Sequence, residues 1–220
     1  MSKEPSIKVD LPKVFCVVGD PIAHSLSPKI HSWFAENEGH IVSYHKSRVT
    51  KGNLKSAIEK FMRLGGKGMN VTVPLKEEAY SISDVRSERA IAAGAANFLS
   101  FGEDGEITAD NTDGYGLITD ISSNLNLSLS GKVVFLLGAG GAARGVVGSI
   151  AEQEPTLLQL SNRTPSKVDK LSSLLPRSCS QEICLLYTSP SPRDQRGSGI
   201  AGCAWKKKRG GGGGGGGGGG

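Results

Sequence analysis

The chain has 220 residues and a formal net charge of +5, and its length suits one large domain or two small ones. The net charge, taken alone, would favour an acidic partner such as nucleic acid or an anionic surface. The sequence has no apolar run long enough to span a membrane and no apolar segment of a secretory signal at its amino terminus, so we predict a soluble, cytoplasmic protein without a membrane partner.

The first half of the chain is predicted to alternate between strands and helices. Residues 1–12 are polar and interrupted by proline, which is typical of a flexible arm. Short apolar or alternating runs predict strands at residues 14–19, 41–49, 66–74, 95–100 and 106–110. Amphipathic or capped segments predict helices at residues 27–38, 53–64, 84–93 and 113–125. The first helix is expected to begin with Ser27 as its N-cap, because Pro28 follows it.

The second half repeats a strand–helix pattern, at residues 133–138, 141–153, 156–161 and 165–175. This spacing predicts parallel strands joined by right-handed crossovers, the beginning of a βαβ arrangement. We therefore predict an α/β protein. Its parts are an amino-terminal α/β domain at residues 13–113, a connecting helix and loop at 114–130, and two strands that begin a Rossmann-type domain at 131–183.

The sequence VVFLLGAGGAARG carries a dinucleotide-binding pattern. Gly138, Gly140 and Ala143 fill G-x-G-x-x-G/A directly after a strand and before a helix. The first glycine allows a tight turn, and the second lets the backbone approach a pyrophosphate, which the helix N-terminus attracts. A glycine-rich turn without a ligand is the alternative. The pattern predicts a cofactor site at Gly138, Ala139, Gly140, Gly141 and Ala142.

The next predicted strand ends in SNRTPSK, where NAD-binding proteins carry a carboxylate for the ribose hydroxyls. Here the chain has Asn162, Arg163 and Thr164, with Lys167 one turn later. Two cations and two short hydrogen-bonding groups suit a 2′-phosphate, so we predict NADP rather than NAD. The same residues also fit an ordinary helix start with Thr164 as N-cap, and the two interpretations are compatible.

Polar residues in the first half stand where open α/β sheets bind ligands. Ser25 and Ser27 follow the first strand, Thr72 and Lys76 follow the third, and Asp113 opens a helix. Each has an ordinary structural explanation: serines cap helices, a lone lysine is usually a solvated surface charge, and an aspartate suits a helix N-terminus.

Six motifs in order make a functional interpretation more specific: HSxSP, NVTxPxK, GAAN, NTDGxG, GAGGAAR and NRT. Together they resemble shikimate dehydrogenase, from about residue 13 to residue 175. The resemblance implies a substrate domain at 13–113 and NADPH-dependent reduction of 3-dehydroshikimate to shikimate, in chorismate and aromatic amino acid biosynthesis. It also implies substrate contacts from Ser25, Ser27, Thr72, Lys76, Asn97 and Asp113.

Within that set, the resemblance implies that Lys76 and Asp113 form the catalytic pair, and it links Glu88 to the cofactor. The chain departs from its relatives at Phe98, where they usually carry threonine after the asparagine. The cysteines Cys16 and Cys179 give neither a disulfide framework nor a metal spacing, so no metal is expected.

Residues 184–220 carry six basic side chains and one acidic one, whereas the preceding part of the chain is neutral overall. One set of codons for residues 184–194 resembles a transposon-end sequencing adapter, and runs of A and G would encode the lysines and the polyglycine. A flexible linker or an RNA-binding tail are the alternatives. We predict that this tail is non-native and disordered, that the genuine chain ends near Ile183, and that nucleic acid is not a partner.

On this interpretation the chain lacks the rest of the cofactor sheet, and we expect the fragment alone to be inactive with an exposed apolar edge. A quinate/shikimate dehydrogenase of the same fold and a non-catalytic NADP-binding module remain as alternatives. The oligomeric state is not readable from the sequence; a homodimer is one option for the full-length enzyme.

Overall fold

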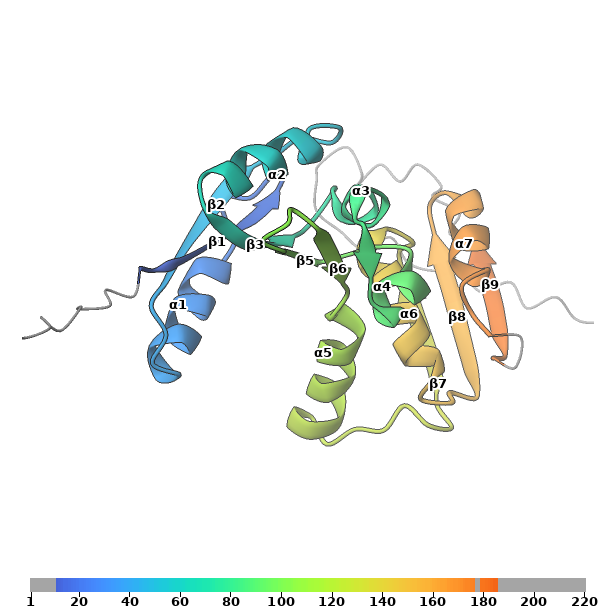
Figure 1. Cartoon of the computed structure of the whole chain (residues 1–220). Coiled ribbons are helices and arrows are strands. Elements are labelled where there is room, and N and C mark those ends of the chain that lie inside the picture. Colours follow the sequence, from blue (N-terminus) through green and yellow to red (C-terminus); the bar gives the residue numbers. More distant parts are fainter. Residues whose placement is uncertain (1–10, 177–178, 186–220) are drawn as a thin grey trace, which may run out of the picture.

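A computed structural model describes residues 11–176 and 179–185, with the backbone alone at 181–185 (Figure 1). Residues 1–10 of the predicted arm at 1–12, and residues 186–220 of the predicted tail at 184–220, lie outside the described residues. The α/β class predicted from the sequence is confirmed.

A six-stranded mixed sheet forms the first part of the molecule (Figure 1). Its spatial order is β2-β1-β3-β5-β6-β4. Strand β1 is parallel to β2 and β3, β5 is antiparallel to β3 and β6, and β4 is parallel to β6. The bounds are β1 Lys13–Gly19, β2 Val42–Arg48, β3 Gly66–Val71, β4 Val85–Arg86, β5 Phe98–Phe101 and β6 Ile107–Asp110.

Five helices accompany this sheet: α1 Ser27–Asn37, α2 Leu54–Arg63, α3 Lys76–Ile82, α4 Glu88–Ala93 and α5 Asp113–Thr119, which continues as a π-helical turn at Asp120–Asn124. Helix α3 was not predicted, and α4 begins four residues later than predicted, after β4. The predicted N-cap of α1 is wrong: Leu26 occupies the cap position and Ser27 is already helical, so that Pro28 lies in the first turn.

The core of this part lies between the sheet and α2. Strand residues alternate between faces, so Cys16, Met69 and Leu99 point to one face, where Leu54 and Ile58 of α2 are buried against them. Burial raises the pKa of the Cys16 thiol to about 12. Helix α1 lies on the opposite face of the sheet (Figure 1).

A second, fully parallel sheet has the order β7-β8-β9. Its strands are β7 Val133–Leu137, β8 Leu157–Asn162 and β9 Gln181–Leu185, and its helices are α6 Gly141–Ala151 and α7 Pro165–Ser172. The parallel pairing of β7 and β8 is as predicted. The expectation of only two strands is wrong, because β9 pairs with β8 and runs through Cys184 and Leu185, two residues of the predicted tail.

One face of β7 is open to solvent. Val133, Phe135 and Leu137 alternate along the strand and are 62%, 48% and 60% exposed. Strand β7 pairs only with β8 among the described residues, so the predicted apolar edge is confirmed. On the other side, α6 and α7 bury Val147 and Val168 against β8.

The two sheets are connected through α5, which packs against α6 of the second sheet (Figure 1). Within the described residues, no helix combines the length and apolar character that a membrane crossing requires.

Candidate active site

The loops after β1 and β3 lie together at the carboxyl ends of these strands. The backbone amide of Thr72 donates to Val18 (2.9 Å), and the amide of Asp20 donates to Val73 (2.9 Å). Gly19 permits this approach, because a Cβ there would lie 2.5 Å from Cγ2 of Thr72. Thr72 is therefore held beside the loop that leads into α1.

The two predicted serines occupy that loop. The hydroxyl of Ser25 donates to the hydroxyl of Ser27 (3.2 Å) and accepts from the Ser27 amide (3.3 Å). Both side chains are half-buried. They form a local turn at the start of α1, and their hydroxyls face one another at the carboxyl end of β1.

Lys76 and Asp113 form a close ion pair. Lys76 is the first residue of α3, and its Nζ donates to Oδ2 of Asp113 at 2.5 Å. Lys76 is only 8% exposed, so the interpretation of this residue as a solvated surface charge is wrong. Asn97 completes the arrangement: its Nδ2 donates to Oδ1 of Asp113 (2.8 Å), and its Oδ1 accepts from the amide of Thr112 (3.0 Å).

Backbone hydrogen bonds bring these three positions together from distant parts of the sequence. The amide of Ala96 donates to the carbonyl of Lys76 (2.9 Å), which ties the start of α3 to the chain just before β5. The amide of Asn97 donates to Asp110 (3.0 Å) at the end of β6, and its carbonyl accepts from Val71 (2.8 Å) at the end of β3. The site therefore depends on β5 lying between β3 and β6.

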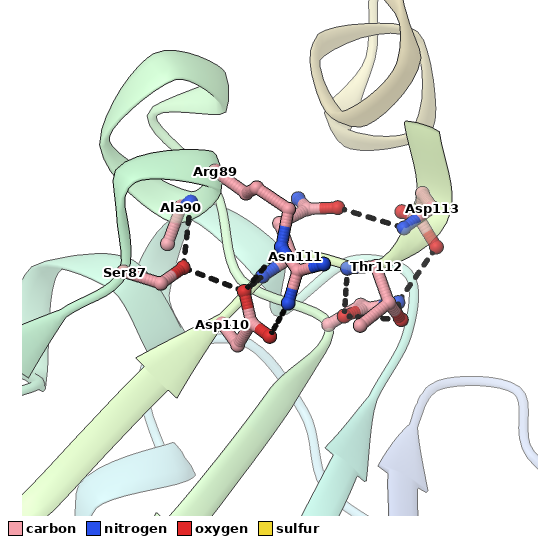
Figure 2. Close-up of polar contacts among 8 residues, drawn as sticks. Ser87, Arg89, Ala90, Asp110, Asn111, Thr112 and Asp113 are labelled. Atoms are coloured by element: carbon pink, nitrogen blue, oxygen red, sulfur yellow. Dashed lines mark hydrogen bonds and ion pairs between the residues drawn. The ribbon is translucent and has the colours of Figure 1, made fainter. Parts of the chain in front are cut away.

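Asp110 anchors the loop that carries Asp113, as Figure 2 shows. Its carboxylate accepts hydrogen bonds from Ser87 Oγ (2.5 Å), from Arg89 Nε (3.1 Å) and from the amide of Asn111 (2.7 Å), and Arg89 also forms an ion pair with it. Burial alone would raise the pKa of Asp110, but the hydrogen bonds from Arg89, Ser87 and Asn111 outweigh it and hold the pKa below its ordinary value. The charged form is therefore stabilised by folding.

Replacing this carboxylate is expected to destabilise the fold in a pH-dependent way. Because the pKa of Asp110 is lowered in the folded state, its contribution is present above the ordinary pKa of about 4 and is lost as pH falls through the folded value. We expect Asp110→Asn to lower the free energy of unfolding by about 1 kcal/mol at neutral pH, a modest figure because Arg89 is half exposed. Urea unfolding between pH 7 and 3 measures this. A difference from the parent that does not shrink below about pH 4 would contradict it.

Asn111 is a site residue that the sequence reasoning missed. It is 2% exposed; its Nδ2 donates to the carbonyl of Ala95 (2.9 Å), and its Oδ1 accepts from the amide of Asp113 (3.1 Å). The signal lies in the ADNTDG motif itself, in which an asparagine stands two residues before the aspartate that opens the helix. Asn111 and Asp110 fix the backbone from which Asp113 reaches Lys76.

The predicted dinucleotide loop joins β7 to α6. Gly138 has φ +114°, a conformation that favours glycine, and its amide donates to the carbonyl of Ser161 (2.7 Å) at the end of β8. Gly140 is the N-cap of α6, with no side-chain cap on the first amides of this helix. Among the residues that the structure describes, none lies within 4 Å of a Cβ built at Gly138 or Gly140. An uncapped helix start with free space in front of it fits a bound pyrophosphate.

This helix start lies against the ion pair. A Cβ on Gly141, the first residue of α6, would lie 3.4 Å from Cβ of Lys76 and 3.8 Å from its Cδ. The stem of Lys76 therefore packs on the N-terminus of α6. The structure thus brings together the predicted cofactor loop and the predicted catalytic pair.

The residues predicted to bind a 2′-phosphate begin with Asn162, the last residue of β8, and continue into the start of α7 at the same edge of the second sheet. Arg163, Thr164 and Lys167 are exposed, and Nδ2 of Asn162 donates to the carbonyl of Thr164 (3.0 Å). Thr164 is the N-cap residue of α7 and Pro165 the first helical residue, as predicted, although the Thr164 side chain makes no capping hydrogen bond among the described residues.

Glu88 is an exposed residue at the start of α4, the helix that packs against α6. A separate cavity of about 240 Å³ lies on the α1 face of the first sheet. Phe15, Tyr44 and Asn70 line it, whereas Lys76 and Asp113 do not. In the described part of the chain, no cluster of His, Cys, Asp or Glu could hold a metal ion.

Comparisons with known proteins identify relatives of both parts. Residues 17–99 match the family model of the shikimate dehydrogenase substrate binding domain. The chain is 47% identical over 157 residues to shikimate dehydrogenase (NADP(+)) from Nitrosomonas europaea, a match that covers 71% of this chain and 57% of the relative. The corresponding protein of Nitrosospira multiformis is 47% identical over 165 residues, 75% of this chain and 60% of the relative. The chain therefore spans about three fifths of the length of these relatives.

A solved structure with the same arrangement is shikimate 5-dehydrogenase from Thermus thermophilus in complex with NADP(H) and shikimate. It is 31% identical, with a TM-score of 0.68, and the match covers 77% of this chain and 62% of that one. The structure of shikimate dehydrogenase from Aquifex aeolicus is 32% identical, with a TM-score of 0.71 and coverage of 79% and 62%.

Proposed function

We propose that this chain is part of a shikimate dehydrogenase, and that the whole protein catalyses the reversible NADPH-dependent reduction of 3-dehydroshikimate to shikimate, a step of chorismate biosynthesis. The observation that carries this proposal is the position of the Lys76–Asp113 pair. It lies at the carboxyl end of the first sheet and packs against the start of α6, where a dinucleotide pyrophosphate fits.

The substrate side of the proposed site is built for a small polyol acid. Ser25, Ser27 and Thr72 supply neutral hydroxyls at the ends of β1 and β3, and Asn97 supplies an amide beside the ion pair. Hydroxyls and amides both donate and accept hydrogen bonds, which suits a ligand with several hydroxyl groups and one carboxylate. We propose that these residues, with Lys76 and Asp113, contact the substrate.

The chemistry requires a proton at the ketone oxygen. When bound, NADPH supplies the hydride that reduces the C3 ketone. We propose that the Lys76 ammonium donates its proton to the oxygen as negative charge develops there. Asp113 holds the ammonium in position, and Asn97 holds Asp113 through its second oxygen. In the reverse direction the neutral amine of Lys76 accepts the proton from the C3 hydroxyl.

The cofactor side lies on the second sheet. We propose that the loop Gly138–Ala142 and the α6 N-terminus bind the pyrophosphate of NADP, with residues 162–164 and Lys167 around the 2′-phosphate. Residues 13–113 would then be the substrate domain and 131–183 the described part of the cofactor domain. A place for Glu88 on the cofactor side remains a proposal from the family resemblance.

Removing the guanidinium of Arg163 is expected to weaken NADPH binding selectively. Loss of charge-assisted hydrogen bonds to a phosphate should raise the Kd for NADPH about tenfold or more, and leave the Kd for NADH, which lacks this phosphate, within about twofold. Fluorescence titration of Arg163→Ala with both nucleotides measures this. Arg63→Ala, at an exposed site at the end of α2, is the matched control. Equal loss of affinity for both nucleotides would contradict the assignment.

Turnover is best tested in a chimera, because the chain spans only part of its relatives. The chimera joins residues 1–176 of this chain to the part of the Nitrosomonas europaea relative that lies beyond the matched region. We expect it to oxidise shikimate with NADP, followed by absorbance at 340 nm. A folded chimera that binds NADPH and does not turn over or bind shikimate would overturn the proposed function.

A further inference from the structure

We propose that Gly145 is a positioning residue for the Lys76–Asp113 pair. Its missing side chain allows the cofactor helix α6 to lie directly against the loop that carries Asp113. The inference rests on the proposed function in one respect only, namely that this pair is catalytic.

The contact at Gly145 leaves no room for a side chain. A Cβ built there would lie 2.8 Å from Oδ2 of Asp113 and 3.0 Å from Oδ1 of Asn111. The first of these oxygens is the one that accepts from Lys76. The second accepts from the Asp113 amide. A methyl group at this position would therefore displace the Asp113 carboxylate and press on the Asn111 side chain that holds it.

The same face of α6 makes two further close contacts. Gly141, one turn before Gly145, packs on the stem of Lys76, and Ser149, one turn after, meets Gly114 of α5. A Cβ at Gly114 would lie 2.3 Å from Oγ of Ser149 and 2.8 Å from the carbonyl of Gly145. One helix face thus touches Lys76, the Asp113 carboxylate and the start of α5.

Glycine inside a helix is less favourable than alanine. Crowding accounts for glycine at Gly145 and Gly114 but not at Gly148 of α6 or Gly116 of α5. In the described part of the chain, nothing lies within 4 Å of a Cβ built at either of the latter two. The absence of a side chain at Gly145 and at Gly114 therefore determines how closely α6 approaches the Lys76–Asp113 ion pair.

The first test follows the exposure of the Lys76 amine in the 220-residue chain without ligands. Competitive acylation with acetic anhydride, read by peptide mass spectrometry, gives the rate at Lys76 relative to the exposed Lys67. We expect Gly145→Ala to raise this relative rate about tenfold, because the amine loses its charge-assisted partner. Gly148→Ala, the matched control, should leave it unchanged. A parental rate in folded Gly145→Ala overturns the proposal.

A second pair of variants tests crowding itself and covers the possibility that Gly145→Ala does not fold. Gly114→Ala should also raise the Lys76 rate, and Gly116→Ala should not. Adding Ser149→Gly removes the hydroxymethyl group that Gly114→Ala meets but leaves the carbonyl of Gly145, 2.8 Å from the new Cβ, so the double variant should recover part of the parental rate. If Gly114→Ala gives the same Lys76 rate as Gly116→Ala, the proposal is wrong.

In the chimera, the same misplacement should appear in kcat. We expect Gly145→Ala to lower kcat about tenfold or more and to leave the KM for NADPH within about twofold of the parental value. The reason is that α6 still binds the nucleotide, whereas the Lys76 ammonium is displaced from the ketone oxygen. A change in thermal stability without a change in kcat or in Lys76 acylation would indicate a purely structural role and overturn the proposal. Failure of the proposed function would appear as an inactive parental chimera, a result that does not affect the acylation measurements.

Discussion

Replacing Lys76 with alanine in the chimera is expected to lower kcat about 10³-fold, because the developing oxyanion loses both its proton donor and its nearest positive charge. The KM for shikimate should change by no more than about threefold, since Ser25, Ser27 and Thr72 remain to bind the substrate. Initial rates of NADPH consumption with 3-dehydroshikimate give both constants. A near-parental kcat for Lys76→Ala would show that Lys76 is not the proton donor.

The matched control for this experiment is Lys67→Ala. Lys67 lies on β3, nine residues before Lys76, and its side chain is exposed, so its loss should leave kcat unchanged. A second comparison is Asp113→Asn, which keeps the shape of the side chain and removes its charge. If Asp113 acts by holding the ammonium, this variant should lose less of kcat than Lys76→Ala and retain the binding of NADPH.

Shortening Leu99 to alanine is expected to lower the free energy of unfolding by about 3 kcal/mol, within the range for leucine-to-alanine changes in a core. Leu99 is fully buried on β5 opposite Met69 and Ala109, and contributes to the core beneath α2. Neighbours on both adjacent strands are fixed by the sheet, so they cannot close the resulting cavity. Urea unfolding followed by far-ultraviolet circular dichroism measures the loss.

Leu64→Ala is the control for this prediction, because Leu64 follows α2 and is 71% exposed. Its substitution should change the free energy of unfolding by no more than about 0.5 kcal/mol. An effect of Leu99→Ala as small as that of Leu64→Ala would mean that β5 is not part of the core. A changed m-value would instead indicate a change in the surface exposed on unfolding or a loss of two-state behaviour.

Most strands of the first sheet were predictable from the sequence because their apolar runs are bounded by glycine or proline. The strand at residues 66–74 was placed well, although pairing ends at Val71. Helix α3 was not predictable in the same way. It has seven residues and begins after Leu75, which cannot cap it, and it is held by tertiary contacts instead. Its Glu78 accepts from the amides of Gly52 and Leu54 at the start of α2.

Strand β9 was missed for a different reason. Its sequence QEICL is short and has no alternation of its own, and it becomes a strand by pairing with β8 from Leu158 to Asn162. Parallel pairing between segments that are distant in sequence leaves little local signal. The predicted boundary at Ile183 rested on the resemblance of possible codons for residues 184–194 to an adapter sequence and on the basic composition of residues 184–220, and neither carries information about strand pairing.

The candidate site was predictable to the extent that its residues lie in motifs. The sequence pointed to Lys76 and Asp113, and the fold places them in contact. It did not reveal that Arg89 of α4 pairs with Asp110, because this contact spans 21 positions and depends on how α4 lies beside β6. Nor did the sequence reveal that α6 contacts Lys76 and Asp113 through Gly141 and Gly145. The dinucleotide motif explains glycines in this region by nucleotide binding and says nothing about a neighbouring helix.

The division of the site between two sheets has a consequence for how such a protein diversifies. The hydroxyls that we propose as substrate contacts come from loops of the first sheet, whereas the residues that we propose as 2′-phosphate contacts lie at and after the end of β8, in the second sheet. On this proposal, coenzyme choice and substrate choice are encoded on separate sheets, and mutations that alter one need not remodel the other. The face of α6 formed by Gly141, Gly145 and Ser149 is the exception, because it belongs to the second sheet but contacts Lys76 and Asp113. Changes on this face would affect the proposed nucleotide site and the proposed catalytic pair together.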